Sequence, residues 1–122
     1  MNPPTTTLFR PVGSKELELI RDSGWRRFPP RLPEQPIFYP VCNERYAAEI
    51  AEQWNAPKGG GFVTRFEVRA DFLAKYDRHV VGASYNEEYW IPAEELKSFN
   101  DAIVGIIEVL REFPPVPPHG PQ

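Results

Sequence analysis

Two charged residues stand inside apolar, strand-like stretches of the sequence. Arg10 lies within residues 8–12 (LFRPV), and Glu88 begins residues 88–92 (EYWIP). A charge in an apolar setting costs free energy unless it is paired or used in chemistry. A guanidinium can hold a pyrophosphate or a carboxylate in bidentate fashion. A carboxylate can orient a ribose hydroxyl, or stabilise an oxocarbenium-like centre when a glycosidic bond breaks.

Two arrangements of Arg10 and Glu88 are compatible with the sequence. If their strands are central and adjacent, both side chains lie on the same side of the sheet and line one aromatic cleft. The alternative, which the residues leave equally open, is a structural Arg10–Glu88 ion pair. Tyr89 and Trp90 follow Glu88 on opposite faces of the strand, so one can wall a pocket while the other anchors the strand in the core.

The other chemically active residue types have structural interpretations. The single cysteine, Cys42, and the two histidines cannot form a usual four-ligand zinc site, so no metal is expected. Cys42 follows a strand in an apolar setting, which predicts a buried, inert thiol. Residues 58–61 (KGGG) lack the Gly-Lys-Ser/Thr of a phosphate-binding loop and predict a turn. Glu94 and Glu95 would lie in the first turn of a helix, where carboxylates interact favourably with the dipole.

Length and composition indicate one globular domain. The chain has 122 residues, of which 41% are hydrophobic and 25% charged, and its net charge is −3. That balance argues against a protein whose main role is to neutralise nucleic-acid phosphates or to coat an anionic membrane. The sequence has no apolar stretch long enough for a bilayer and no secretory signal at its start, so we expect a cytoplasmic protein without a membrane partner.

Prolines mark two stretches of the chain. Five of the fifteen prolines fall within residues 114–122, which predicts a disordered tail after a single domain at residues 1–113. Another five lie between Pro29 and Pro40, interleaved with arginines and aromatic residues. That mixture predicts an ordered loop anchored by its aromatic side chains.

Hydrophobic periodicity predicts short helices and strands in alternation. Strands are expected at 7–10, 36–39, 62–68, 79–81, 88–91 and 103–110, and helical segments at 14–21, 43–54, 71–76 and 92–100. Ser14 and Asn43 are the expected N-caps. Pro11 is expected to close the first strand, and the apolar run 103–110 to be a central strand. The element order predicts a mixed α+β sandwich rather than a doubly wound parallel sheet.

The order of these segments resembles the ADP-ribosyltransferase-like fold. The resemblance rests on four segments of residues 7–110: LFRPV with the helix ELELI and Ser23-Gly24, IFY with the helix YAAEIA, the strand at 62–68, and EYWIP followed by IIEV. The chain is also similar to a group of small bacterial proteins often labelled "ADP-ribosylation/crystallin J1". The sequence departs from the family pattern in having Asn86 and Glu87 where a Glu-x-Glu or Gln-x-Glu motif would place its first residues.

The resemblance implies a fold, a substrate and roles for four residues. The fold would be an ADP-ribosyltransferase-like mixed β-sheet sandwich with short flanking helices, and the substrate would be NAD. Arg10 would hold NAD, Tyr39 would stack on nicotinamide with Phe38 as the competitor for that role, and Glu88 would be the catalytic glutamate. The ADP-ribose would pass to an unknown protein or nucleic-acid acceptor, or to water. The alternative is a non-catalytic binding module of the same fold that holds a protein partner or another nucleotide, and the sequence leaves open whether the protein is an enzyme.

Overall fold

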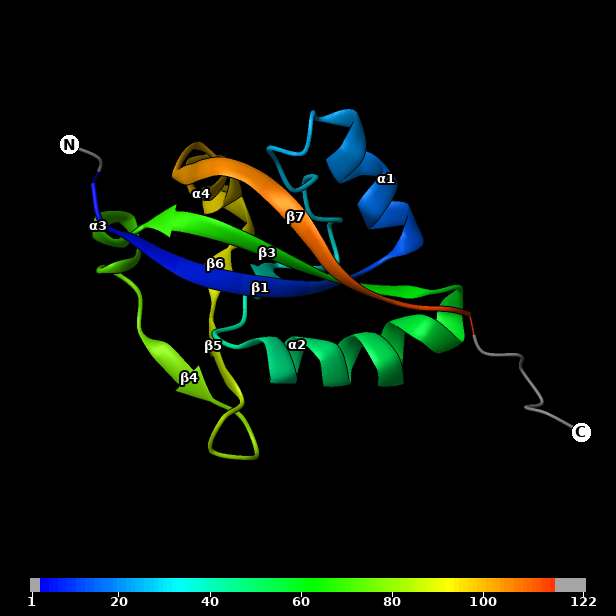
Figure 1. The fold of residues 1–122 in the computed structure, drawn as a ribbon. Helices are drawn as coiled ribbons and strands as arrows, with labels where there is room; N and C mark the ends of the chain where they lie inside the picture. Colours follow the sequence, from blue (N-terminus) through cyan, green and yellow to red (C-terminus); the bar gives the residue numbers. More distant parts are fainter. Residues whose placement is uncertain (1–2, 116–122) are drawn as a thin grey trace, which may run out of the picture.

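A three-stranded antiparallel sheet forms the centre of the computed structural model, which describes residues 3–115. The sheet has the order β1 (Thr5–Gly13), β3 (Gly61–Arg69) and β7 (Ile103–Phe113). Figure 1 shows these strands crossing the molecule, with helices above and below them. The prediction of a mixed α+β structure is confirmed.

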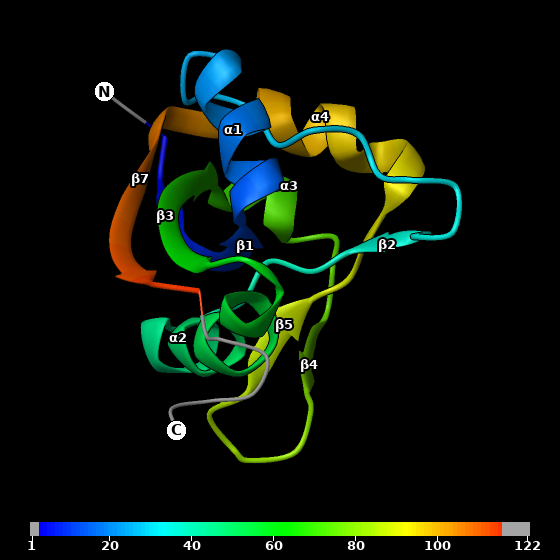
Figure 2. The same ribbon diagram turned by 90° about the vertical axis from the view of Figure 1, so that its right-hand side faces the viewer.

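The two faces of this sheet are covered by different helices. α1 (Ser14–Asp22), α3 (Ala70–Leu73) and α4 (Leu96–Asp101) lie on one side, and α2 (Glu44–Ile50) lies on the other (Figures 1 and 2). Residues alternate between the faces along a strand, so Leu8 and Val12 pack into the larger core on the α1 side. Phe9 and Val63 pack with the alanines of α2. We call these the α1 face and the α2 face.

Two short ladders lie beside the main sheet. β2 (Ile37–Phe38) pairs with β6 (Ile91–Pro92), and β4 (Arg78–Val80) pairs with β5 (Glu87–Tyr89). A single residue, Val41, connects the second ladder to the main sheet, because it bridges Phe9 of β1 on one side and Glu88 of β5 on the other.

The helix predicted at 43–54 ends differently from the prediction. Asn43 is its N-cap, as expected, and its side chain accepts a hydrogen bond from the Tyr46 amide at 2.8 Å. After Ile50 the chain widens into a π turn, η1 (Ala51–Asn55), followed by the 3₁₀ turn η2 (Ala56–Lys58). The π turn changes the direction of the side chains, and Trp54, the last residue of the predicted helix, is 63% exposed.

β3 begins in close contact with this π turn. A Cβ atom built on Gly61 would lie 2.3 Å from the carbonyl oxygen of Ala51. Only glycine allows the strand and the turn to approach so closely. The residue opposite in the sheet, Gly13, has room for a Cβ, with Asn55 Nδ2 as its nearest neighbour at 3.7 Å.

The prediction of a central strand at 103–110 is wrong. β7 is longer than expected and lies at the edge of the sheet, with Val104, Ile106 and Val109 all more than two-fifths exposed. Its apolar run alone could not distinguish a strand buried on both faces from an edge strand, because neighbours decide burial. The Trp25 carbonyl accepts a hydrogen bond from the Ile107 amide, so one point of this edge is covered.

The remaining elements differ from the predictions at their ends. α1 follows Gly13 as its N-cap and starts at Ser14, which makes no side-chain cap. The helix predicted from Pro92 begins as the 3₁₀ turn η3 (Ala93–Glu95) before α4. The predicted tail at 114–122 lies almost wholly outside the described residues. Among residues 3–115, no helix has the length and apolar character needed to cross a membrane.

Candidate functional site

Pro11 leaves part of β1 without a neighbouring strand. Phe9 exchanges two backbone hydrogen bonds with Val41, at 2.9 and 2.7 Å. Two residues further along the same edge comes Pro11, which has no N–H to continue the ladder. β1 therefore does not close at Pro11 as predicted. β1 continues in register with β3 to Gly13. Only the opposite edge of β1, the one that pairs with Val41 at Phe9, has no backbone partner from Pro11 onward within residues 3–115.

A pocket of about 480 Å³ lies beside this unpaired edge. We call it the Glu88 pocket. Its nine lining residues come from β1, from the segment before α2, from α2 and its π turn, and from the β4–β5 region: Arg10, Pro11, Tyr39, Val41, Ile50, Asn55, Val81, Glu88 and Trp90. The size is in the range of small-molecule sites in proteins.

Arg10 is buried and paired, but its partner is Glu16 of α1. Its Nε donates to Glu16 Oε2 at 2.7 Å, and its Nη2 donates to Glu16 Oε1 at 3.0 Å. Its Nη1 donates to the Tyr39 carbonyl at 3.3 Å, and its guanidinium carbon lies 4.5 Å from the centre of the Phe38 ring. The alternative of an Arg10–Glu88 ion pair is therefore not what the structure has, because α1 brings the Glu16 carboxylate to the guanidinium.

Glu88 is a buried carboxyl group at the pocket wall. It is 8% exposed, and its Oε1 accepts a hydrogen bond from the Tyr46 hydroxyl at 3.5 Å. Burial raises the pKa of Glu88, because a carboxylate loses hydration there, while donors on Trp90 and Tyr46 and the nearby His79 oppose the rise. Burial and Glu88 together raise the pKa of Tyr46.

Arg10 and Glu88 reach the same pocket from opposite faces of the sheet. Glu88 lies opposite Val41, which lies opposite Phe9, and residues paired in this way point to one face, here the α2 face. Arg10 follows Phe9 in β1 and points to the α1 face. The expectation of adjacent strands with both side chains on one side is therefore wrong, since Val41 stands between the strands. Both residues line the pocket only because the edge beside Pro11 is open.

The two aromatic candidates have different positions. Tyr39 is 41% exposed and lines the Glu88 pocket, where its ring meets Trp90 edge-on at 6.5 Å between centroids. Phe38 is fully buried and packs against Phe28 and Phe99 in the core. Tyr39 therefore remains a candidate for stacking on a ligand, whereas Phe38 serves the core.

Trp90 and Asn55 also line the pocket, the first as one of two alternatives that the sequence offered and the second without a prediction. Trp90 stacks on the His79 ring at 3.7 Å with an angle of 7° between the planes. Asn55 Oδ1 is buried and has no hydrogen-bond donor among the described residues. Of the two aromatic residues after Glu88, Trp90 lines the pocket and Tyr89 is buried in the core, as one of the two predicted arrangements has it. Asn55 had no signal in the sequence, because the π turn that orients it is not visible in the hydrophobic pattern.

Metal ligands and similarity to known proteins were two further possible indications of function. Within residues 3–115, no three His, Cys, Asp or Glu side chains gather as metal ligands would. Comparison with models of protein families, with curated proteins and with solved structures finds no match for the chain.

Proposed function

We propose that the Glu88 pocket binds NAD and that Glu88 promotes cleavage of its bond to nicotinamide. The observation that carries this proposal is the position of one buried carboxyl group, Glu88, beside two exposed aromatic rings, Tyr39 and Trp90. Aromatic rings suit a planar base or nicotinamide, because stacking needs only a flat apolar surface. A carboxylate next to them can accept a hydrogen bond from a ribose hydroxyl.

The reaction needs no covalent bond to the protein. The bond between ribose C1′ and the nicotinamide nitrogen breaks, and its electron pair leaves with nicotinamide. Positive charge then develops on the ribose, where the Glu88 carboxylate stabilises it. Water or an acceptor group bonds to C1′ and gives up its proton, which yields free ADP-ribose or a modified acceptor.

Asn55 and Arg10 give this proposal its binding groups. The unpaired Asn55 Oδ1 at the pocket wall can accept a hydrogen bond from a ligand hydroxyl. Arg10 already uses three of its five N–H donors, so it can offer a ligand phosphate only the remaining two. Arg10 would therefore have two roles, to position the residues of the pocket wall and to contact the ligand.

Nicotinamide release from NAD tests the proposal. Wild-type protein should release nicotinamide, and Glu88→Gln should lower the rate by at least about a hundredfold while NAD still protects the variant from heat. Glu87→Gln is the matched control, because it removes the same charge from the neighbouring position, on the other face of β5. Equal rates for the two variants would contradict the role of Glu88.

The bidentate pair between Arg10 and Glu16 favours a second candidate, a binding module without catalysis. A guanidinium that is already neutralised holds a ligand diphosphate less strongly than a free one. In that case a nucleotide or a protein partner occupies the aromatic pocket and is released unchanged. NAD that raises the melting temperature but yields no nicotinamide would select this candidate.

A further inference from the structure

A second pocket, of about 570 Å³, lies on the α1 face of the same strand edge. We call it the Arg31 pocket. It is formed between β1, α1 and the proline-rich loop, and its polar lining residues are Arg10, Lys15, Glu16, Arg31, Gln35 and Asn55. It shares Arg10, Pro11 and Asn55 with the Glu88 pocket, so the two pockets adjoin.

Positive charge exceeds negative charge in the Arg31 pocket. Three cations line it, Arg10, Lys15 and Arg31, against one carboxylate, Glu16. Both oxygens of Glu16 already accept hydrogen bonds from Arg10. Among the described residues no carboxylate forms an ion pair with Arg31 or Lys15, so the lining of the pocket has a net positive charge.

Arg31 has an unused donor in a partly dehydrated place. Its Nε is buried and has no hydrogen-bond acceptor within residues 3–115. The Arg31 guanidinium carbon lies 5.9 Å from the centre of the Phe38 ring. The guanidinium carbon of Arg10 lies 4.5 Å from the centre of the same ring. Burial, followed by the Arg10 charge, lowers the pKa of Arg31, and the nearby Glu16 charge partly opposes this shift. A buried donor without an acceptor costs free energy, and an anion would remove that cost.

The loop that carries Arg31 is held in place at several points. Pro29, Pro30 and Pro33 restrict its backbone. Asn100 of α4 accepts from the Phe28 amide at 2.9 Å and donates to the Phe28 carbonyl at 3.0 Å. These contacts hold the start of the loop, three residues before Arg31, which lowers the conformational entropy that a ligand would have to remove there.

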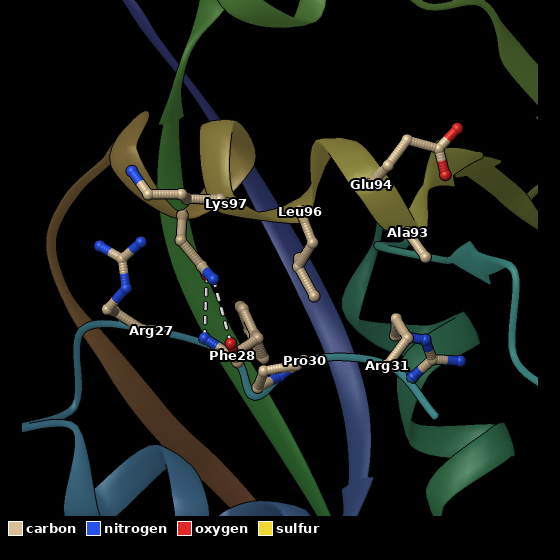
Figure 3. A pocket seen from close by; sticks show the side chains of 9 residues that line it. Arg27, Phe28, Pro30, Arg31, Ala93, Glu94, Leu96 and Lys97 are labelled. Carbon is tan, nitrogen blue, oxygen red and sulfur yellow. Dashed lines mark hydrogen bonds between the residues drawn. The ribbon is translucent and has the colours of Figure 1, made fainter. Parts of the chain in front are cut away.

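The pocket on the other side of the loop is also lined by three cations and one carboxylate, but two of those cations are already paired. The pocket between the loop and the segment of η3 and α4 has a volume of about 430 Å³. In Figure 3, Arg27 and Lys97 lie toward one end of it, and Arg31 and Glu94 lie toward the other end on opposite sides. Arg27 and Lys97 both pair with Asp101, at 3.0 and 3.3 Å. Arg27 and Lys97 therefore share one carboxylate, whereas on the α1 side Lys15 and Arg31 form no ion pair among the described residues. This difference favours the α1 side of Arg31 for an anion.

We propose that the Arg31 pocket is an anion site that binds a phosphate or pyrophosphate group of a small molecule. Arg31 presents a planar fork of N–H donors to phosphate oxygens, and Lys15 adds a mobile charge at the rim. The site does not need Glu88 or any cleavage of NAD. A ligand longer than pyrophosphate would extend across Arg10 and Asn55 into the Glu88 pocket.

Binding of inorganic pyrophosphate, measured by calorimetry at low salt, tests the site. The wild-type protein should bind pyrophosphate, and its affinity should fall as salt is added. Arg31→Gln and Lys15→Gln should each weaken binding, by about tenfold for Arg31→Gln. Arg26→Gln is the matched control, because Arg26 is an exposed arginine three residues after Ser23 that lines none of the described pockets.

Two outcomes would overturn the assignment. One is a wild-type protein that binds no pyrophosphate at millimolar concentration, and the other is equal weakening by Arg26→Gln and the two pocket variants. Lys15 is exposed, so Lys15→Gln should leave the fold intact. Its pyrophosphate affinity therefore still tests the site if Arg31→Gln unfolds. Glu88→Gln should bind pyrophosphate like wild type, which separates a failure of this site from a failure of NAD cleavage.

Discussion

Arg10 and Glu16 form a bidentate ion pair between β1 and the first turns of α1, with Nε–Oε2 and Nη2–Oε1 distances of 2.7 and 3.0 Å. The Arg10 side chain is 10% exposed and that of Glu16 is 21% exposed. Glu16 therefore neutralises the Arg10 charge, which β1 places in the core. The pair also holds Arg10 in position, and Arg10 lines both pockets.

Removal of the Glu16 charge should destabilise the fold. Glu16→Gln leaves the buried Arg10 guanidinium without a counter-charge, which should lower the free energy of unfolding by about 3 kcal/mol. Glu18→Gln removes the same charge from an exposed position of α1 and should change it by less than about 0.5 kcal/mol. Urea denaturation of both variants measures the difference, and equal stabilities would show that the pair contributes nothing.

Glu88→Gln should change how stability depends on pH. Because burial raises the pKa of Glu88 above its ordinary 4.5, the folded protein binds this proton more tightly than the unfolded chain. The stabilisation that follows is present below the ordinary pKa and is lost as pH rises through the raised value. Denaturation between about pH 4 and pH 7 should show wild type losing stability relative to Glu88→Gln. A difference that does not vary with pH would contradict this reasoning.

Asn100 should be required for the position of the proline-rich loop. Asn100→Ala leaves the buried amide and carbonyl of Phe28 without partners, which should cost about 2–4 kcal/mol of stability. Ser98→Ala changes an exposed residue of the same helix and serves as the control. Hydrogen exchange at Phe28 should become faster in Asn100→Ala even where the fold persists. Unchanged exchange would mean that the loop is held by other contacts.

Gly61→Ala should be far more damaging than Gly13→Ala. The new Cβ at position 61 would clash with the Ala51 carbonyl, and separating β3 from the π turn should cost about 2 kcal/mol. At position 13 the new Cβ meets its nearest neighbour at 3.7 Å, an ordinary contact. Melting temperatures of the two variants give the comparison, and equal losses would argue against a steric role for Gly61.

Cys42 should react slowly with alkylating reagents. Burial raises the pKa of the Cys42 thiol from 9.0 to about 11, so at neutral pH the thiolate fraction falls about a hundredfold below that of an ordinary cysteine. Iodoacetamide labelling of the folded protein should therefore be much slower than labelling in denaturant. Labelling at similar rates in both conditions would contradict the expected inert thiol.

Local chemistry in the sequence determined most of the elements. Asn43 followed by apolar residues three and four apart specified the start of α2, and alternation specified β3, because both patterns reflect neighbours along the chain. The apolar surroundings of Arg10 and Glu88 marked them as charges that need a partner or a function. These inferences need only the geometry of one helix or one strand.

Only the tertiary structure decided which residues meet. The carboxylate that reaches Arg10 is Glu16, because α1 folds back over β1, and Val41 separates β1 from β5. β7 is an edge strand although its composition suits the centre, and the π turn directs Trp54 outward and Asn55 into the pockets. Each outcome depends on how whole elements pack against one another, even for Arg10 and Glu16, which are only six residues apart. The free-energy differences among such packings do not appear in any local pattern of residues.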